Sequence, residues 1–163
     1  MKEFQIYTDG SCLGNPGAGG YAAVIIADNG NFEEIVGGEP ETTNNRMELM
    51  AAIVALKKVS PDDFVELFTD SSYLKNAFTQ GWLVNWKRNG WKTANKKSVL
   101  NIDLWKKLDA LILNRNIKFN WVKGHAGNKF NERCDKLARA EAERQKNKPV
   151  KKLFKPVQLT LFD

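Results

Sequence analysis

The hydrophobic residues of the chain follow two different spacings, which separate predicted strands from predicted helices. Two-residue alternation, or a short apolar run between turn signals, predicts strands at 4–8, 21–27, 32–37, 65–69 and 117–122. Spacing of three and four residues predicts helices from Thr43 or Asn44 to before Pro61, at 72–80, at 101–113 and at 128–145. Three consecutive strands followed by alternating strands and helices predict an α/β fold, with a mixed five-stranded sheet flanked by helices.

A glycine-rich segment, residues 14–20, separates the first two predicted strands and is interpreted as a loop. The run from Gly17 to Ala22 fails the dinucleotide-binding pattern G-x-G-x-x-G at its last position, and no Walker lysine follows it. The segment is therefore predicted to be a turn and not a nucleotide-binding loop.

Length and composition favour one soluble domain followed by a tail. The 163 residues suit a single domain at 1–145, whereas 146–163 is rich in Lys, Pro and Asn and is predicted to be a flexible basic tail. The longest uncharged apolar stretch, 21–27, is too short to cross a bilayer, and no secretory signal is visible. We therefore expect no membrane partner, a cytoplasmic location and a monomer.

Only two cysteines are present, too few for a disulfide scaffold. This number indicates a reducing compartment. Cys12 and Cys134 are expected to be small buried hydrophobic residues.

The net charge of +6 is concentrated in two windows. Residues 82–97 hold five basic side chains and 144–155 hold six, with no acidic residue in either window, so the remainder of the chain is acidic. Such a distribution is typical of a protein that binds a polyanion. The alternative is a pair of lysine-rich surfaces that are merely solvated.

Four acidic residues are candidates for a metal site. Asp9 and Asp70 each follow a predicted strand, and they would meet at one edge of the sheet if those strands are parallel neighbours. Glu48 has small helical neighbours that would let it approach the sheet, and Asp135 lies near the start of the last helix. Clustered carboxylates suit Mg²⁺ or Mn²⁺, and two such ions can clamp a phosphodiester. Taken singly, each residue could instead cap a helix, hold a turn or be solvated.

The segments around these acidic residues resemble those of type 1 ribonuclease H, the bacterial form, over about residues 4–142. The resemblance is carried, in order, by Thr8–Gly17 (TDGSCLGNPG), Thr43–Leu49 (TNNRMEL), Thr69–Ser71 (TDS), Trp121–Gly127 (WVKGHAG) and Asn131–Asp135 (NERCD). It implies a ribonuclease H-like fold in which Asp9, Glu48, Asp70 and Asp135 hold two Mg²⁺ ions. The implied reaction is endonucleolytic hydrolysis of the RNA strand of an RNA–DNA hybrid, which leaves 5′-phosphate and 3′-hydroxyl ends.

The same resemblance assigns further roles. His125 is expected to assist proton transfer or product release, although the neighbouring residues 128–130 depart from the best-known bacterial pattern. Ser72 stands where family members often carry a glutamine that contacts the minor groove. The residues expected to contact the hybrid near the cut are Asn15, Asn44 and Asn45, with Thr43 on a phosphate of the DNA strand.

Two basic segments also have counterparts in known proteins. The first resembles the protrusion that grips the DNA strand, and its candidate contacts are Trp82, Trp86, Lys87, Arg88, Trp91, Lys96 and Lys97. The alternative for each tryptophan is a place in the core. The tail resembles, at Gln158, Leu159, Leu161 and Phe162, the peptide by which bacterial replication and repair proteins dock on the DNA sliding clamp.

Two other functions remain open at this stage. An integrase-like nuclease that cuts DNA would share the fold, and a hybrid-binding module without catalysis would share the basic surface. The four carboxylates, the histidine loop and the basic segment together favour the ribonuclease.

Overall fold

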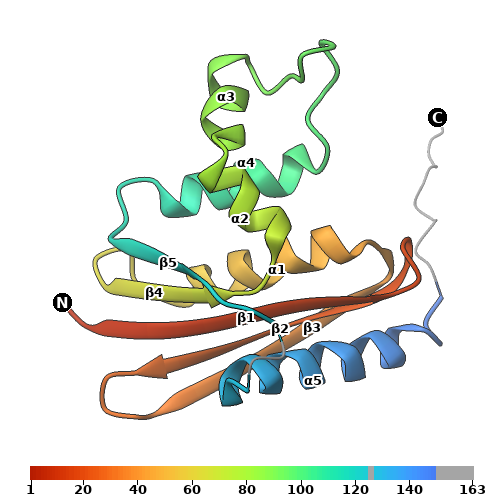
Figure 1. Ribbon diagram of the computed structural model, residues 1–163. Helices are drawn as coiled ribbons and strands as arrows, with labels where there is room; N and C mark the ends of the chain where they lie inside the picture. Colours follow the sequence, from red (N-terminus) through yellow and green to blue (C-terminus); the bar gives the residue numbers. More distant parts are fainter. Residues whose placement is uncertain (125–126, 150–163) are drawn as a thin grey trace, which may run out of the picture.

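The computed structural model describes residues 1–124 and 127–149 and contains a five-stranded mixed sheet (Figure 1). The strands are β1 (Glu3–Leu13), β2 (Gly17–Ala27), β3 (Phe32–Thr42), β4 (Phe64–Thr69) and β5 (Ile117–Trp121). Their order is β3-β2-β1-β4-β5, with β2 antiparallel to β1 and β3, and β4 parallel to β1 and β5. The predicted mixed sheet is therefore confirmed.

Helices cover both faces of this sheet. They are α1 (Asn44–Lys57), α2 (Ser72–Thr79), α3 (Trp82–Arg88), α4 (Ile102–Ile112) and α5 (Lys129–Gln145). Helix α5 lies along one face, and the other helices lie on the opposite side, where α3 stands farthest from the sheet (Figure 1).

Each face of the sheet has its own hydrophobic core, because successive residues of a strand point in opposite directions. Ile6 belongs to the larger core under α1 and α4, which also contains Leu49 and Trp105. The next residue, Tyr7, belongs to the smaller core under α5, together with Ala138. The core around β1 thus anchors the strand that leads to Asp9.

The prediction of a loop over residues 14–20 is wrong. Strand β1 continues to Leu13 and β2 begins at Gly17, so that Gly20 pairs with Ser11. A Cβ atom at Gly20 would overlap the carbonyl oxygen of Ala138 in α5. The glycines lack the alternating side chains by which a strand is recognised, and their role is to let the backbone of α5 approach the sheet.

Helix α3 was not predicted, since only one of its residues, Leu83, is fully buried and no apolar stripe marks it. The tryptophans around it are half-buried against the larger core. The rings of Trp86 and Trp105 lie 5.4 Å apart, and those of Trp82 and Trp86 lie 6.1 Å apart. These side chains therefore support the protrusion as well as lining it.

Helix α5 ends at Gln145, where the tail was predicted to begin. The clamp-binding candidates Gln158, Leu159, Leu161 and Phe162 lie outside the described residues, and their role stays a prediction. Within the described part of the chain, none of the helices combines the length and apolar content of a membrane span.

Candidate active site

Three of the four predicted carboxylates meet at one end of the sheet. Asp9, Glu48 and Asp70 each offer an oxygen, and these oxygens all lie within 4.8 Å of one another. Asp9 and Asp70 converge because β1 and β4 are parallel and pair Tyr7 with Phe68, two residues before each aspartate. The predicted convergence of the two aspartates is therefore confirmed, but the prediction that Asp9 ends its strand is wrong, because β1 continues beside β2 to Leu13.

Glu48 reaches the two aspartates because α1 lies directly on β1. Its helix begins where the side chain of Thr43 accepts a hydrogen bond from the backbone N–H of Arg46, at 3.2 Å. At the contact with β1, a Cβ atom on Gly10 would lie 2.5 Å from the backbone nitrogen of Glu48. Only glycine allows this approach, so Gly10 sets the distance between Asp9 and the helix that carries Glu48.

The protein environment disfavours negative charge on two of these side chains. Asp9 and Glu48 are 5% and 6% exposed. Burial, followed by the charge of Asp70, raises the pKa of Asp9 to about 7. Burial raises the pKa of Glu48 well above its ordinary value, and the charges of Asp9 and Asp70 add to the effect.

This donor set fits a divalent cation. One buried oxygen of Glu48, Oε1, has no hydrogen-bond partner among the described residues, although buried carboxylate oxygens are normally paired. A cation would supply that partner and would remove the repulsion within the cluster. Carboxylate oxygens are the ligands that Mg²⁺ and Mn²⁺ prefer.

The raised pKa of Asp9 predicts how stability depends on pH when divalent ions are removed by EDTA. Because the pKa rises from 3.8 to about 7 on folding, the folded state binds the proton more tightly, and stability falls as the pH rises through this interval. The decline attributable to Asp9 is at most about 4 kcal/mol. Urea unfolding of the wild type and of Asp9→Asn between pH 4 and 8 measures it. Equal slopes for the two proteins would contradict the assignment, and Mg²⁺ should flatten the wild-type slope alone.

Asp135 lies beside this trio and not within it. Its side chain is close enough to Asp9 for a hydrogen bond and for charge repulsion, and both raise the pKa of Asp9. Its Oδ2 also forms an ion pair with Nη2 of Arg139, one helical turn later, at 3.0 Å. Asp135 therefore lies beside Asp9 but outside the group of three converging oxygens, and its role as a ligand stays a prediction. His125 lies outside the described residues, and its auxiliary role stays a prediction.

The residues expected to contact the hybrid near the cut gather at the start of α1. The side-chain oxygen of Asn15, in the turn between β1 and β2, accepts a hydrogen bond from the backbone N–H of Asn44 at 3.1 Å. Thr43 caps the same helix, and Asn44 and Asn45 are half-buried in its first turn. The turn and the helix are thereby fixed together next to Glu48. Ser72 is exposed at the start of α2.

The basic side chains of segment 82–97 differ in whether their charge is already paired within the protein. Arg88, Lys96 and Lys97 are exposed. By contrast, Nζ of Lys87 forms an ion pair with Asp109 at 3.1 Å, and the Trp91 ring lies 5.7 Å from Nζ of Lys106. Arg88, Lys96 and Lys97, together with the exposed Lys92, therefore present most of the positive charge, a distinction that the sequence pattern did not make.

Sequence reasoning missed two glycines of the site and was wrong about one cysteine. A Cβ atom at Gly124 would lie 2.7 Å from Oδ2 of Asp70, so this loop approaches the cluster closely, as Gly10 does from β1. The sequence feature that could have indicated these close approaches is the glycine inside each motif, Gly10 in TDGSCLGNPG and Gly124 in WVKGHAG. Cys134 is buried as expected, but Cys12 is only half-buried. The sulfur of Cys12 lies 3.5 Å from the carbonyl oxygen of Gly17 and 3.4 Å from that of Thr42, so its one S–H can donate to either.

The comparisons with known proteins agree with this geometry. A sequence model of the RNase H family matches residues 1–143. Ribonuclease H of Enterobacter sp. (strain 638) is 57% identical over 141 residues, which cover 86% of this chain and 90% of that protein. Ribonuclease H of Escherichia coli (strain K12 / DH10B) is 56% identical over 142 residues, which cover 87% and 90% of the two chains.

Solved structures are similar as well. LC9-RNase H1, described as a type 1 RNase H with the type 2 active-site motif, has a TM-score of 0.77 and 31% identity, covering 89% of this chain and 74% of that one. LC11-RNase H1, solved in complex with an RNA/DNA hybrid, has a TM-score of 0.63 and 26% identity, covering 86% and 97%. Because the family match spans most of the chain and includes all four acidic residues, this chain belongs to the ribonuclease H family.

Proposed function

We propose that this ribonuclease H is an endonuclease that hydrolyses the RNA strand of RNA–DNA hybrids with two divalent ions, and leaves 5′-phosphate and 3′-hydroxyl ends. The observation that carries the proposal is the trio of carboxylates within 4.8 Å, one of which keeps a buried oxygen without a hydrogen-bond partner in the described part of the chain. Asp9, Glu48, Asp70 and Asp135 would hold the ions. Mg²⁺ is the ion we propose, and Mn²⁺ suits the same oxygens.

The chemistry that bound divalent ions supply at such a site is activation of the attacking water and stabilisation of the leaving 3′ oxygen. The chain itself supplies position and charge. Gly10 sets the separation between the buried side chains of Asp9 and Glu48, because it lets β1 contact the backbone of α1. Asp70 is held beside them because it follows β4, which runs parallel to β1. The half-buried amides at the start of α1 would orient the strand to be cut. His125 would assist proton transfer or product release.

A cleavage assay separates this proposal from its alternatives. The protein is incubated with labelled RNA–DNA, RNA–RNA and DNA–DNA duplexes in Mg²⁺, with EDTA as the control. We expect Mg²⁺-dependent cleavage of the RNA strand of the hybrid alone. Cleavage of DNA would support an integrase-like nuclease, and tight hybrid binding without cleavage would support a binding module.

The exposed cations of the basic segment should provide affinity for the hybrid through phosphate contacts. Reversing Arg88, Lys96 and Lys97 to glutamate should raise KM and reduce the salt dependence of KM, because each lost phosphate contact removes about 0.7–0.9 from the slope against log salt. The measurement is KM between 50 and 200 mM salt, roughly the range in which such contacts act.

The matched control for this variant reverses Lys2, Lys57 and Lys118 to glutamate. These exposed lysines lie at the end of the domain opposite the carboxylates, since Lys2 precedes β1, Lys57 ends α1 and Lys118 is the second residue of β5. The control changes the net charge equally and should leave the slope unchanged. Equal slopes in both variants would mean that residues 82–97 do not grip the hybrid.

The proposal also assigns a role to each of the two predicted parts of the chain, the domain and the tail. Residues 1–145 would be the catalytic domain, and 146–163 would be a basic tether whose final peptide docks on the DNA sliding clamp through Leu161 and Phe162. Such a tether suits an enzyme that acts in the cytoplasm during replication, where hybrids arise.

A further inference from the structure

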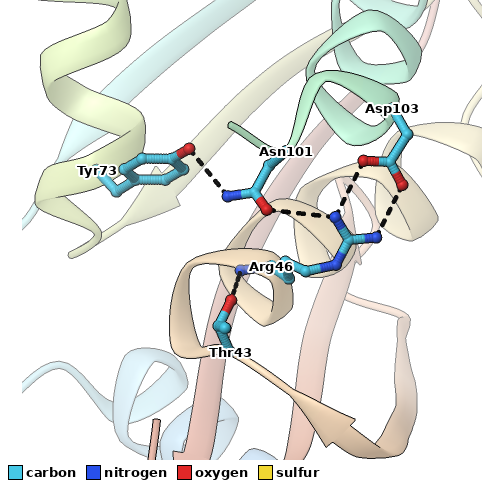
Figure 2. Close-up of polar contacts among 5 residues, drawn as sticks. All are labelled: Thr43, Arg46, Tyr73, Asn101 and Asp103. Atoms are coloured by element: carbon cyan, nitrogen blue, oxygen red, sulfur yellow. Dashed lines mark hydrogen bonds and ion pairs between the residues drawn. The ribbon is translucent and has the colours of Figure 1, made fainter. Parts of the chain in front are cut away.

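We propose that Arg46 is a positioning residue that fixes the basic segment 82–97 relative to the carboxylate cluster. The inference rests on the proposed function, because it concerns how a gripped hybrid is aligned with the ligands of the ions. It is carried by a hydrogen-bond network that joins the helices α1, α2 and α4 (Figure 2).

Arg46 is at the centre of this network. Its Nη1 and Nη2 donate to the two carboxylate oxygens of Asp103 at 3.0 and 2.8 Å, a two-point contact that fixes the plane of the guanidinium. The hydrogen bonds hold the pKa of the Asp103 carboxyl below its usual value. Nη1 also donates to the side-chain oxygen of Asn101 at 3.3 Å. Figure 2 shows the guanidinium pointing from α1 toward the start of α4.

Asn101 continues the network to α2. Its side-chain nitrogen donates to the hydroxyl of Tyr73 at 3.1 Å, and the indole nitrogen of the buried Trp105 donates to the same hydroxyl at 3.0 Å. Tyr73 lies three residues after Asp70, on the helix that Ser71 caps through the N–H of Leu74 at 3.2 Å. The chain of contacts therefore runs from the helix of Glu48 to the helix that follows Asp70.

Asn101 also marks the point where the basic segment returns to the domain. The segment closes on itself through a bridge between Lys92 and Ser98 and a hydrogen bond from the N–H of Val99 to the carbonyl of Trp91 at 3.2 Å. Asn101 then takes a left-handed backbone conformation, φ 61°, and α4 begins. Held by Arg46 and Tyr73, Asn101 links the base of the basic segment to α1, which carries Glu48, and to α2, which follows Asp70. It does so in addition to the packing of Trp86 on Trp105.

The backbone of Arg46 belongs to the helical turn next to the carboxylate cluster, and its guanidinium contacts the base of the basic segment. Its backbone N–H is the group that Thr43 caps, in the helical turn that also holds Asn44 and Asn45, and Glu48 follows two residues later. Its guanidinium holds Asn101, at the base of the basic segment. A hybrid bound by the basic segment is therefore aligned with the cluster through this side chain, and a shift of about 1 Å in such an alignment costs roughly 100-fold in rate.

The test compares Arg46→Ala with a variant that loses a similar ion pair elsewhere. The control is Glu34→Ala, which removes a two-point contact from Arg133 at 2.7 and 3.0 Å between β3 and α5, remote from the basic segment. Asp103→Ala breaks the same network from α4 and keeps α1 intact, so it replaces Arg46→Ala should that variant fail to fold. Thermal unfolding, kcat and KM are measured for each protein, and hybrid affinity is measured in EDTA.

We expect Arg46→Ala and Asp103→Ala to lower kcat roughly tenfold to 100-fold, with Arg46→Lys intermediate, whereas Glu34→Ala changes only thermal stability. A double-mutant cycle measures the coupling between Arg46 and the exposed cations of the basic segment. Replacing Arg88, Lys96 and Lys97 by alanine should reduce kcat/KM in the wild type by a larger factor than in Arg46→Ala, because the grip no longer aligns the hybrid.

Additive effects in the cycle, or a kcat within about twofold of wild type in both network variants, would overturn the inference. Those results would leave the proposed function intact as long as the wild type cleaves the hybrid. Failure of the wild type to cleave would instead refute the proposed function itself.

Discussion

Asp70→Asn should abolish cleavage of a hybrid, with a loss in kcat of at least about 1,000-fold, while hybrid affinity in EDTA stays near that of the wild type. The amide has nearly the shape of the carboxylate, but it carries no charge and is a poor ligand for a hard cation. The cluster would lose the negative charge of one of the three carboxylates whose oxygens lie within 4.8 Å. Single-turnover cleavage in saturating Mg²⁺ measures the loss.

Thermal stability separates this result from misfolding. Because the charge of Asp70 contributes to raising the pKa values of both Asp9 and Glu48, its removal relieves repulsion, and Asp70→Asn should unfold at a higher temperature than the wild type in EDTA. Asp62→Asn, at an exposed carboxylate remote from the cluster, serves as the control and should change neither property. Near-normal turnover by Asp70→Asn in Mg²⁺ would remove Asp70 from the set of ligands.

Gly10→Ala adds a single methyl group near the site, and it should reduce both stability and kcat strongly. The new Cβ would lie 2.5 Å from the nitrogen of Glu48 and 2.6 Å from the carbonyl carbon of Met47, and both are backbone atoms that cannot rotate away. Helix α1 must then shift by about 1 Å, which we expect to cost 1–3 kcal/mol in stability and about 100-fold in kcat. Urea unfolding and steady-state kinetics measure the two effects.

Gly30→Ala is the matched control for this substitution. Gly30 has φ 90°, so alanine is strained there, but nothing surrounds the position and it lies in the turn between β2 and β3. This variant should lose about 1 kcal/mol of stability and no activity. If Gly10→Ala lost stability without losing kcat, the close contact between β1 and α1 would serve packing alone.

Periodicity made the carboxylates candidates for one site, and the resemblance of their motifs to those of ribonuclease H is what assigned them to it. Asp70 directly follows β4 and Glu48 lies on a helix with small neighbours, as expected, but Asp9 lies within β1, whose continuation to Leu13 was not predicted. The parallel pairing of β1 with β4 is what brings the two aspartates together. Asp135 was harder to place. Helical spacing put it on the face with Asn131 and Arg139, but its position beside the trio depends on how closely α5 meets the sheet.

The features that escaped prediction depend on contacts between distant residues or on missing side chains. Gly17 and Gly20 lie in a strand that carries no alternation, and α3 has too few buried residues to show a helical stripe. Arg46 and Asn101 are 55 residues apart, and neither residue type indicates the other. Periodicity reports burial within one element, whereas these contacts depend on the tertiary arrangement of several elements.

The glycine contact between β2 and α5 has a consequence for how the family can diverge. At Gly20 the spacing between helix and sheet is set by main-chain atoms in direct contact, so it does not vary with the volumes of nearby side chains. Conservative replacements in the smaller core, at Val24 or Leu137 for example, should leave the depth of Asp135 unaltered. The interior on this side is thus free to drift over evolution without disturbing the reaction centre.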